Sequence, residues 1–313
     1  MTQLSPAEEA AYAALRTRAV CFESPGRWSA FRGDKAAVAL NGLVTNDVAV
    51  LEIGGCLYAA ALTPKGKMVA DMMIVRSDST TFLIHVLPPA ASDWLALARK
   101  YVNPRLCQVA DEADRYRSWF VVGVHAAAVL NASTLRIPMQ VYPAPPLGDL
   151  PAFLLVAESA SAADAGHELA AAGVIAGSSG VWEIARMEAG RPEMGREMDE
   201  NTIPQEANLD ALDAISFSKG CYTGQETVAR VHFRGHVNKH LRGLLSDAPL
   251  NRGAEVSDSA GKLVGDVRSA VTSPRLASIA LAMIRREVAS GSAVSVASAH
   301  GPISARVIDL PFK

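Results

Sequence analysis

The sequence has few cysteines, little net charge and no long apolar run. Its four cysteines are far apart and form no C-x-x-C pair, which argues against a zinc knuckle or a dense disulfide framework. The formal net charge of −2 gives no strong field for nucleic acid, so we expect no direct DNA binding. No apolar stretch approaches the ~18 residues that span a bilayer. The polar, acidic start of the chain is unlike a signal peptide, so we expect a cytoplasmic protein, away from membranes, with reduced cysteines.

Several catalytic signatures are also missing. There is no glycine-rich phosphate loop of Walker or Rossmann type and no G-x-S-x-G, so nucleotide-kinase and hydrolase functions have no support. No heptad run or long apolar surface helix is evident, and we therefore expect a monomer.

What is present predicts an α+β fold followed by a β-barrel. Strand and helix patterns alternate with hairpin turns over residues 1–235, without regular βαβ units. From residue 236 the sequence pattern changes to short strands separated by Gly, Pro and Ser turns, which is typical of a small barrel. We therefore expect a region of two interleaved α+β subdomains over 1–235, with their internal boundary left open, and a barrel domain over 236–313. Near the start, Ser5 and Glu8 predict a capped helix that runs to about Arg18.

The stretch "SFSKGCYTGQETVAR" at 216–230 contains the most reactive residue type in an unusual setting. Thr223 and Glu226 fit a capping box, which predicts a helix beginning just after Cys221. The positive end of that helix and the nearby Lys219 would both lower the pKa of the thiol and favour thiolate. The alternative is that Cys221 is a small buried apolar residue.

Two carboxylates interrupt otherwise apolar patterns. Asp71 lies within the strand pattern "MVADMMIV", where it needs a partner or a role if its face of the strand is buried. Glu188 lies near the predicted end of the helix "VWEIARMEA", where the helix dipole slightly disfavours a negative charge. Such a placement is sometimes functional, but a solvated surface glutamate is the commoner outcome. Asn46 and Asp47 are better explained as a turn or cap.

The segment after the Cys221 stretch is basic and contains three histidines. His232, His236 and His240 have helical spacing, but Gly235 interrupts them and no carboxylate or cysteine completes a set, so we expect no metal site. Arg230 and Arg234 could face an anionic ligand tail or an RNA phosphate, or could lie on a solvated face.

Several stretches together resemble a known family. "KGCYTGQE" at 219–226, within "IPQEANLDALDAISFSKGCYTGQETVARVHFRG", resembles the YgfZ family of folate-binding proteins linked to iron–sulfur cluster assembly and repair. "RMEAG" at 186–190 and "LNGLVTNDVAVLEIGG" near the N-terminus resemble both that family and the aminomethyltransferase, or T-protein, of glycine cleavage. The similarity covers the chain from about residue 30 onward, and the Lys-Gly-Cys string is its specific part.

The resemblance implies an aminomethyltransferase-like fold of two ferredoxin-like units and a C-terminal barrel around a central channel. It implies tetrahydrofolate, or a one-carbon-substituted folate, as the cofactor. Iron–sulfur client or assembly proteins, including tRNA-modifying enzymes, would be the partners. The expected reactive residues are Cys221, Lys219 and Asp71. The expected folate contacts are Glu188 at the pterin, Arg230 or Arg234 at the glutamate tail, and Gln225.

One departure bears on the activity. T-proteins carry adjacent aspartates where this chain has Ala70-Asp71, and they lack the Lys-Gly-Cys motif. Both differences disfavour the alternative function, a folate-dependent aminomethyltransferase of glycine cleavage type with Asp71 as its acid–base group. A third hypothesis is a folate-sensing scaffold without chemistry. The sequence leaves open whether there is turnover and whether Cys221 acts on folate, on iron or on a client protein.

Overall fold

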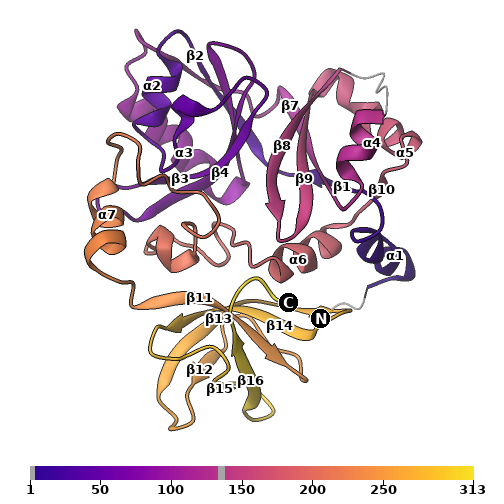
Figure 1. The fold of residues 1–313 in the computed structure, drawn as a ribbon, viewed down its shortest axis with the longest axis vertical. Coiled ribbons are helices and arrows are strands. Elements are labelled where there is room, and N and C mark those ends of the chain that lie inside the picture. Colours follow the sequence, from indigo (N-terminus) through magenta and orange to yellow (C-terminus); the bar gives the residue numbers. More distant parts are fainter. Residues whose placement is uncertain (1–3, 133–137) are drawn as a thin grey trace.

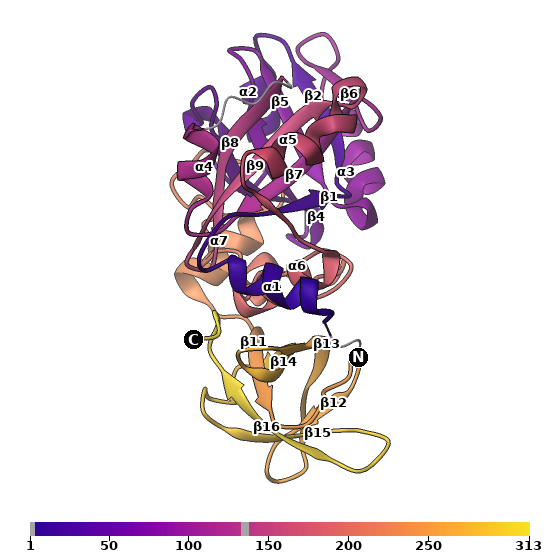
Figure 2. The same ribbon diagram turned by 90° about the vertical axis from the view of Figure 1, so that its right-hand side faces the viewer.

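The computed structural model describes residues 4–132 and 138–313, which form two α+β units beside each other and a barrel beneath them (Figure 1). The quarter-turn view shows helices α1 and α6 between the α+β units and the barrel (Figure 2). This arrangement confirms the predicted α+β class with a barrel at the C-terminal end of the chain. Within the described ranges, no helix combines the length and apolar character needed to cross a membrane.

The first unit is a five-stranded antiparallel sheet. Its strands, in spatial order, are β3 (Cys56–Leu62), β4 (Met68–Arg76), β5 (Thr81–Val86), β2 (Arg27–Arg32) and β6 (Gln108–Asp111). Helices α2 (Ala36–Asn41) and α3 (Pro88–Tyr101) pack on one face, over a core that includes the stacked rings of Phe31 and Trp94. The predicted strand that carries Asp71 is β4.

The second unit has a similar sheet. Its strands, in spatial order, are β10 (Ile175–Ala176), β1 (Val20–Ser24), β7 (Tyr116–Val122), β9 (Leu150–Glu158) and β8 (Met139–Leu147). Helices α4 (Ala126–Ala132) and α5 (Ala165–Ala171), with the short helix η2 (Ser159–Asp164), cover its outer face. Because β1 joins this sheet and β2 joins the other, the chain passes from the second unit into the first and back, so the two units are interleaved.

The inner faces of the two sheets pack against each other. The largest apolar core contains Trp28 and Tyr58 from the first sheet together with Phe120 and Leu154 from the second. Side chains of a strand alternate between its two faces, so each sheet gives one set of residues to this shared core and the other set to its own helices. Residues at the edge of the shared core therefore come from both units.

The C-terminal strands close into a six-stranded barrel. In spatial order they are β11 (Lys239–Ser246), β14 (Ala277–Arg285), β13 (Leu263–Ser273), β12 (Glu255–Ser257), β15 (Ala293–Val296) and β16 (Ile303–Ile308). Pairing of β16 with β11 closes the ring, which leaves no free sheet edge around the barrel. The division of the chain into domains at residues 235 and 236 stays a prediction.

Side chains cap the N-termini of three helices. Helix α1 (Pro6–Ala14) has the predicted capping box between Ser5 and Glu8 but ends four residues before Arg18. Asp47 caps the short helix η1 (Val48–Val50), which confirms its structural interpretation. Helix α6 (Ser179–Glu188) is capped by the hydroxyl of Ser178.

Helix α7 (Gln225–Arg234) begins differently from the prediction. Its N-cap is Gly224, which has a φ of 85°, and no side chain caps the helix, so the proposed Thr223 capping box is wrong. The Thr223 hydroxyl instead donates to the carbonyl oxygen of Gly42 at 3.5 Å. A Cβ at position 224 would lie 2.6 Å from the carbonyl oxygen of Thr63. The close approach and the left-handed φ both require glycine there, and this overrides the local capping signal.

Candidate functional site

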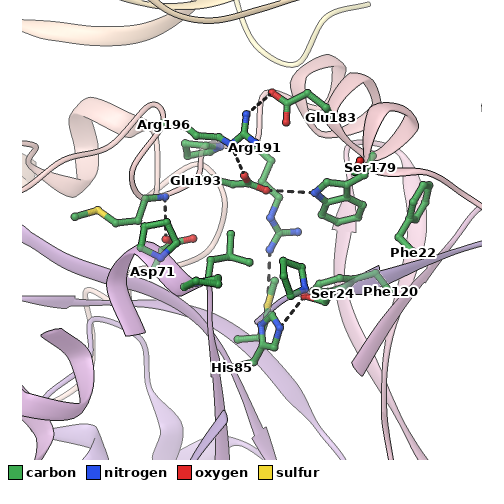
Figure 3. Close-up of a pocket in the computed structure, with 18 of the residues that line it drawn as sticks. Phe22, Ser24, Asp71, His85, Phe120, Ser179, Glu183, Arg191, Glu193 and Arg196 are labelled. Carbon is green, nitrogen blue, oxygen red and sulfur yellow. Dashed lines mark hydrogen bonds and ion pairs between the residues drawn. The ribbon is translucent and has the colours of Figure 1, made fainter. Parts of the chain in front are cut away.

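A cavity of about 400 Å³ opens where the two sheets meet helix α6 and the segment that follows it (Figure 3). Strands β1, β4, β5 and β7 supply its walls, and residues 191–196 cover one side. Its size falls in the range of small-molecule sites, which are mostly apolar with a few placed polar groups. The side chains that define its chemistry are Phe22, Ser24, Tyr58, Asp71, Met73, His85, Phe120, Trp182, Glu183, Arg191, Glu193 and Arg196.

Three aromatic rings form one wall of the pocket. The rings of Phe120 and Trp182 are stacked, with centroids 5.2 Å apart and planes at 22°. Phe22 lies 5.4 Å from Trp182 in a tilted arrangement. Phe22 and Phe120 come from neighbouring strands, β1 and β7, and Trp182 comes from the first turns of α6. This wall can bind a flat heteroaromatic ring by stacking.

A buried cluster of one arginine and three glutamates supports the covering segment. Arg186 is fully buried, and its guanidinium contacts Glu183 at 2.7 Å, Glu197 at 3.1 Å and Glu193 at 3.5 Å. Glu183 lies one helical turn before Arg186, so both side chains fall on the same face of α6. Arg186 therefore fixes the loop that carries Glu193 and Glu197 against the helix.

Glu193 connects this cluster to the aromatic wall. Its carboxylate accepts a hydrogen bond from the Trp182 indole N–H at 3.3 Å and forms an ion pair with Arg196 at 3.2 Å. Burial raises the pKa of Glu193 although Arg186 lies beside it. The carboxylate thus fixes the orientation of the indole ring at the rim of the cavity.

Asp71 is buried at the opposite side of the pocket. It accepts hydrogen bonds from the hydroxyl of Tyr58 at 2.9 Å and from the backbone N–H of Met194 at 3.2 Å. Burial raises the pKa of Asp71 in spite of both hydrogen bonds and the nearby charge of Arg191. The sequence left open whether this face of the strand is buried, and the structure answers that it is.

Arg191 projects into the cavity (Figure 3). Its guanidinium lies 4.7 Å from the centroid of the Tyr58 ring, and one of its N–H groups donates to the sulfur of Met73 at 3.7 Å. Among residues 4–132 and 138–313, no carboxylate forms an ion pair with it. A cation in an apolar pocket without a counter-ion is unusual, and it suggests that a ligand supplies the partner.

His85 lies at the floor of the pocket as a neutral imidazole. Burial, with a further contribution from the charge of Arg191, lowers its pKa from 6.5 to about 4. Its Nε2 is 2.9 Å from the hydroxyl oxygen of Ser24. The backbone of Gly26 passes directly over the ring, where a Cβ would lie 1.8 Å from Nε2. Glycine at this position therefore allows the imidazole to occupy the floor.

Cys221 lies outside this pocket. Its side chain is exposed, on the loop between η3 (Pro204–Ala207) and α7. Lys219 is buried beside it, and its ammonium group donates to the carbonyl oxygens of Asn41, Val44 and Asn46, each at 2.7 Å. All three ammonium donors are thus used by backbone. Burial lowers the pKa of Lys219 to about 8.

These contacts make Lys219 an anchor for the loop. It ties the Lys-Gly-Cys motif to the segment between α2 and η1. Activation of the Cys221 thiol by Lys219 stays a prediction, and the direction of the ammonium donors gives it no support.

Glu188 lies between α1, α6 and the barrel, and does not line the aromatic pocket. Its carboxylate accepts hydrogen bonds from the hydroxyls of Tyr12 and Ser273, each at 2.5 Å, and pairs with Arg16 at 2.7 Å. It borders a separate cavity of about 380 Å³ near the end of the chain. These contacts explain how a carboxylate is tolerated at the end of α6. Its role at a pterin ring stays a prediction.

The other expected folate contacts lie on α7. Gln225 begins that helix, and Arg230 and Arg234 are exposed along it. None of the three lines the aromatic pocket. Their roles as folate contacts also stay predictions. Within the part of the chain that the structure describes, no group of three or more His, Cys, Asp or Glu side chains is arranged to hold a metal ion.

Reasoning from sequence missed most of the pocket. Arg191 and Glu193 follow α6 in a stretch, "GRPEMGRE", that has no helical or strand periodicity. Phe22 and Trp182 meet although 160 residues separate them in the chain. A single local signal was available: two arginines and two glutamates lie close to the "RMEAG" motif, and no helical periodicity predicts that they lie on a solvated helix face.

Comparison with known proteins places the chain in a family. Residues 3–142 match the family model of the GCVT N-terminal domain, and residues 239–313 match that of the glycine cleavage T-protein C-terminal barrel domain. The "tRNA-modifying protein YgfZ" of Yersinia enterocolitica is 32% identical over 229 residues, which cover 70% of this chain and 68% of the relative. The chain belongs to the YgfZ family. The resemblance inferred from the Lys-Gly-Cys motif is confirmed.

Other comparisons agree with this assignment. The "tRNA-modifying protein YgfZ" of Sodalis glossinidius is 30% identical over 218 residues, which cover 67% of this chain and 66% of the relative. The crystal structure of glycine cleavage system aminomethyltransferase T from Bartonella henselae superposes with a TM-score of 0.85, over 97% of this chain and 89% of the other. Its sequence identity is 21%, so this likeness shows the fold. The aminomethyltransferase-like fold class is thereby confirmed.

Proposed function

We propose that this chain is a tetrahydrofolate-binding protein that supports the assembly or repair of iron–sulfur clusters in client enzymes. The clients include enzymes that modify tRNA, in line with the name of its Yersinia relative. The observation that carries the folate part is the pocket, which combines an aromatic wall, a buried carboxyl group and a guanidinium that forms no ion pair with any residue the structure describes. Folate binding fits this family and its fold. We further propose that the protein acts in the cytoplasm as a monomer.

The residues present suit a reduced folate. A pterin is flat and presents ring donors and a carbonyl acceptor, so the wall of Phe22, Phe120 and Trp182 would stack against it while Asp71 and Arg191 meet its polar atoms. When bound, tetrahydrofolate supplies nitrogen atoms that carry one-carbon units. The chain's own contribution is to hold the ring, orient its edge and exclude water from the apolar floor.

The folate part is tested by equilibrium titration of tetrahydrofolate into the protein under anaerobic conditions. Replacement of Trp182 by Leu removes a stacking ring, and we expect about tenfold weaker binding. The matched control is Tyr101→Leu, because Tyr101 is an exposed aromatic residue at the end of α3, outside the pocket. Equal affinity in the parent protein and Trp182→Leu would contradict this location of the site.

The client part depends on Cys221, which we assign to an encounter with a partner and not with the bound folate. Its exposure and its absence from the pocket lining support this assignment. We expect Cys221→Ala to bind tetrahydrofolate as the parent protein does and to lose the ability to sustain client-enzyme activity. Cys107→Ala, at a buried cysteine in the first unit, is the control for loss of a thiol. Full client activity with Cys221→Ala would refute the thiol role.

A second candidate is an aminomethyltransferase of glycine cleavage type. The buried Asp71 in the pocket is the observation that favours it, because a carboxyl group with a raised pKa suits proton transfer. The departure at Ala70 and the weaker support from the relatives count against it. Formation of methylene-tetrahydrofolate from an aminomethylated carrier protein, lost in Asp71→Asn, would favour the transferase.

A further inference from the structure

Two polar groups in the pocket keep hydrogen-bonding capacity that the described residues do not use. The Arg191 guanidinium has five N–H donors, and it contacts the Met73 sulfur and the face of the Tyr58 ring. Each oxygen of Asp71 accepts one hydrogen bond, from Tyr58 or from the Met194 backbone, whereas a carboxylate offers about four acceptor positions. One group can still donate and the other can still accept.

Tyr58 places these two groups next to each other. Its hydroxyl donates to Asp71 at 2.9 Å, and its ring lies 4.7 Å beneath the Arg191 guanidinium. Both side chains line the same cavity (Figure 3). The pocket therefore presents an acceptor and a donor side by side on one wall, at positions set by a tyrosine that is itself buried.

The other charged groups of the pocket are already partnered. Glu193 has Arg186, Arg196 and the Trp182 indole N–H, and Glu183 has the same two arginines. A ligand would have to break existing ion pairs to use these groups. The free acceptor and the free donor are thus the groups best able to recognise a polar edge.

A pterin has such an edge. Its pyrimidinone ring carries N3–H and the 2-amino group as donors, and the 4-oxo group beside them as an acceptor. We propose that Asp71 accepts from the N3–H side of this edge and that Arg191 donates to the 4-oxo oxygen. This makes Arg191 the residue that selects 4-oxo pteridines over 4-amino pteridines. The inference rests on the proposed folate-binding function. It adds that the site recognises the 4-oxo group of the ligand.

The chemistry of arginine makes the selection strong. Arginine has no acceptor, so a 4-amino group would meet it donor to donor, whereas a 4-oxo group completes a charge-assisted hydrogen bond. A binding site that hydrogen-bonds one group rejects an analogue with the wrong polarity, because the protein group that the bound ligand shields from water is left unpaired. The low polarity around the Met73 floor strengthens the discrimination.

The test compares tetrahydrofolate with its 4-amino analogue, at the same reduction state and at a pH where both rings are neutral. Binding of each is measured by anaerobic calorimetry. The parent protein should prefer the 4-oxo ligand by at least about tenfold, the value of one hydrogen bond to a charged group. Arg191→Met should weaken binding of tetrahydrofolate by about tenfold or more and leave the 4-amino analogue unchanged or tighter. Arg191→Lys should retain part of the preference, since it keeps a donor.

Arg285→Met is the control, because Arg285 is an exposed arginine on strand β14 of the barrel, outside the pocket. Its preference for the 4-oxo ligand should match that of the parent. Equal weakening of both ligands in Arg191→Met, or equal binding of both by the parent, would overturn the assignment of Arg191 while leaving folate binding intact. Failure of the parent to bind either ligand would refute the proposed function itself. Thermal unfolding of each variant checks that it is folded.

Discussion

The pocket holds the partly buried cation Arg191 and the Cys221 loop holds the buried cation Lys219, and the two differ in how they are partnered. In the loop, Lys219 uses its three ammonium donors on backbone carbonyl oxygens, and the neighbouring thiol is exposed. In the pocket, Arg191 has no carboxylate partner among the described residues, and Asp71 keeps free acceptor positions. A saturated cation holds structure, whereas an unsaturated one is available to a ligand. From this difference we infer that the pocket binds a small molecule and that the loop presents the exposed Cys221 thiol to a partner.

Replacing Arg186 should have the largest effect on the pocket. This arginine is the buried cation that forms ion pairs with Glu183, Glu193 and Glu197. Removing one partner of a buried ion pair leaves an uncompensated charge and costs about 3–5 kcal/mol. We expect Arg186→Met to lose about that much free energy of unfolding, measured by urea denaturation, and to lose folate binding because the segment 191–196 is released. Arg196→Met, at an exposed ion pair, should lose less than about 1 kcal/mol.

His85 should make the stability of the pocket region depend on pH. Its pKa falls from 6.5 to about 4 on folding, so the unfolded chain takes up the proton first as the pH decreases. Stability from this group is therefore complete above pH 6.5 and is lost as the pH falls towards 4, by about 3 kcal/mol in all. His85→Gln removes the titration, so the difference in unfolding free energy between parent and variant should change over this range. A difference that stays constant with pH would contradict the buried neutral imidazole.

Replacing Lys219 tests whether the Cys221 loop is separate from the pocket. Lys219→Met should leave three backbone carbonyl oxygens without their donor and lower the free energy of unfolding by roughly 2 kcal/mol. Folate affinity should not change, because the loop does not line the pocket. Lys67→Met is the control, since the Lys67 ammonium donates to a single carbonyl oxygen at an exposed site. If Lys219→Met weakened folate binding as strongly as Trp182→Leu, the two regions would not be separate.

The sequence predicts those parts of the fold that local chemistry determines. The Ser5 capping box, the strand around Asp71 and the strand-rich barrel each depend on residues a few positions apart. The Thr223 prediction was wrong because a tertiary contact decided it: the backbone of Gly224 lies against Thr63, and only glycine fits. Local signals fail where the packing of distant segments has the larger energetic effect.

The candidate site was less predictable for the same reason. Asp71 was found from its place in an apolar strand, but its neighbour Met194 lies 123 positions along the chain. Arg191 and Glu193 lie in a loop that the ion pairs of the buried Arg186 hold in place. No periodic sequence pattern predicts the path of such a loop. For Glu188 the sequence identified the residue through its motif but did not predict its surroundings, because its hydrogen-bond partner Tyr12 lies 176 positions away.

Asp71 gives the smallest effect on stability and the clearest separation of stability from function. Burial raises its pKa in the folded state, so ionisation disfavours folding as the pH rises above 3.8, the ordinary pKa of an aspartate side chain. Asp71→Asn removes this charge and retains the hydrogen bond from the Met194 N–H, while the Tyr58 hydroxyl can accept from the new amide. We expect a gain in unfolding free energy on the order of 1 kcal/mol at neutral pH, as is common when a functional group is replaced by a better-matched one.

The same variant should bind tetrahydrofolate more weakly, because an amide in place of a carboxylate loses the charge that a pterin N–H favours. Parallel urea denaturation and calorimetry at neutral pH measure the two effects, and the gain in stability should shrink as the pH falls towards 3.8. A variant that was less stable and bound folate normally would assign Asp71 to the framework, as Lys219 is in the loop. A variant that was more stable and bound folate poorly would place Asp71 with Arg191 among the groups kept free for a ligand.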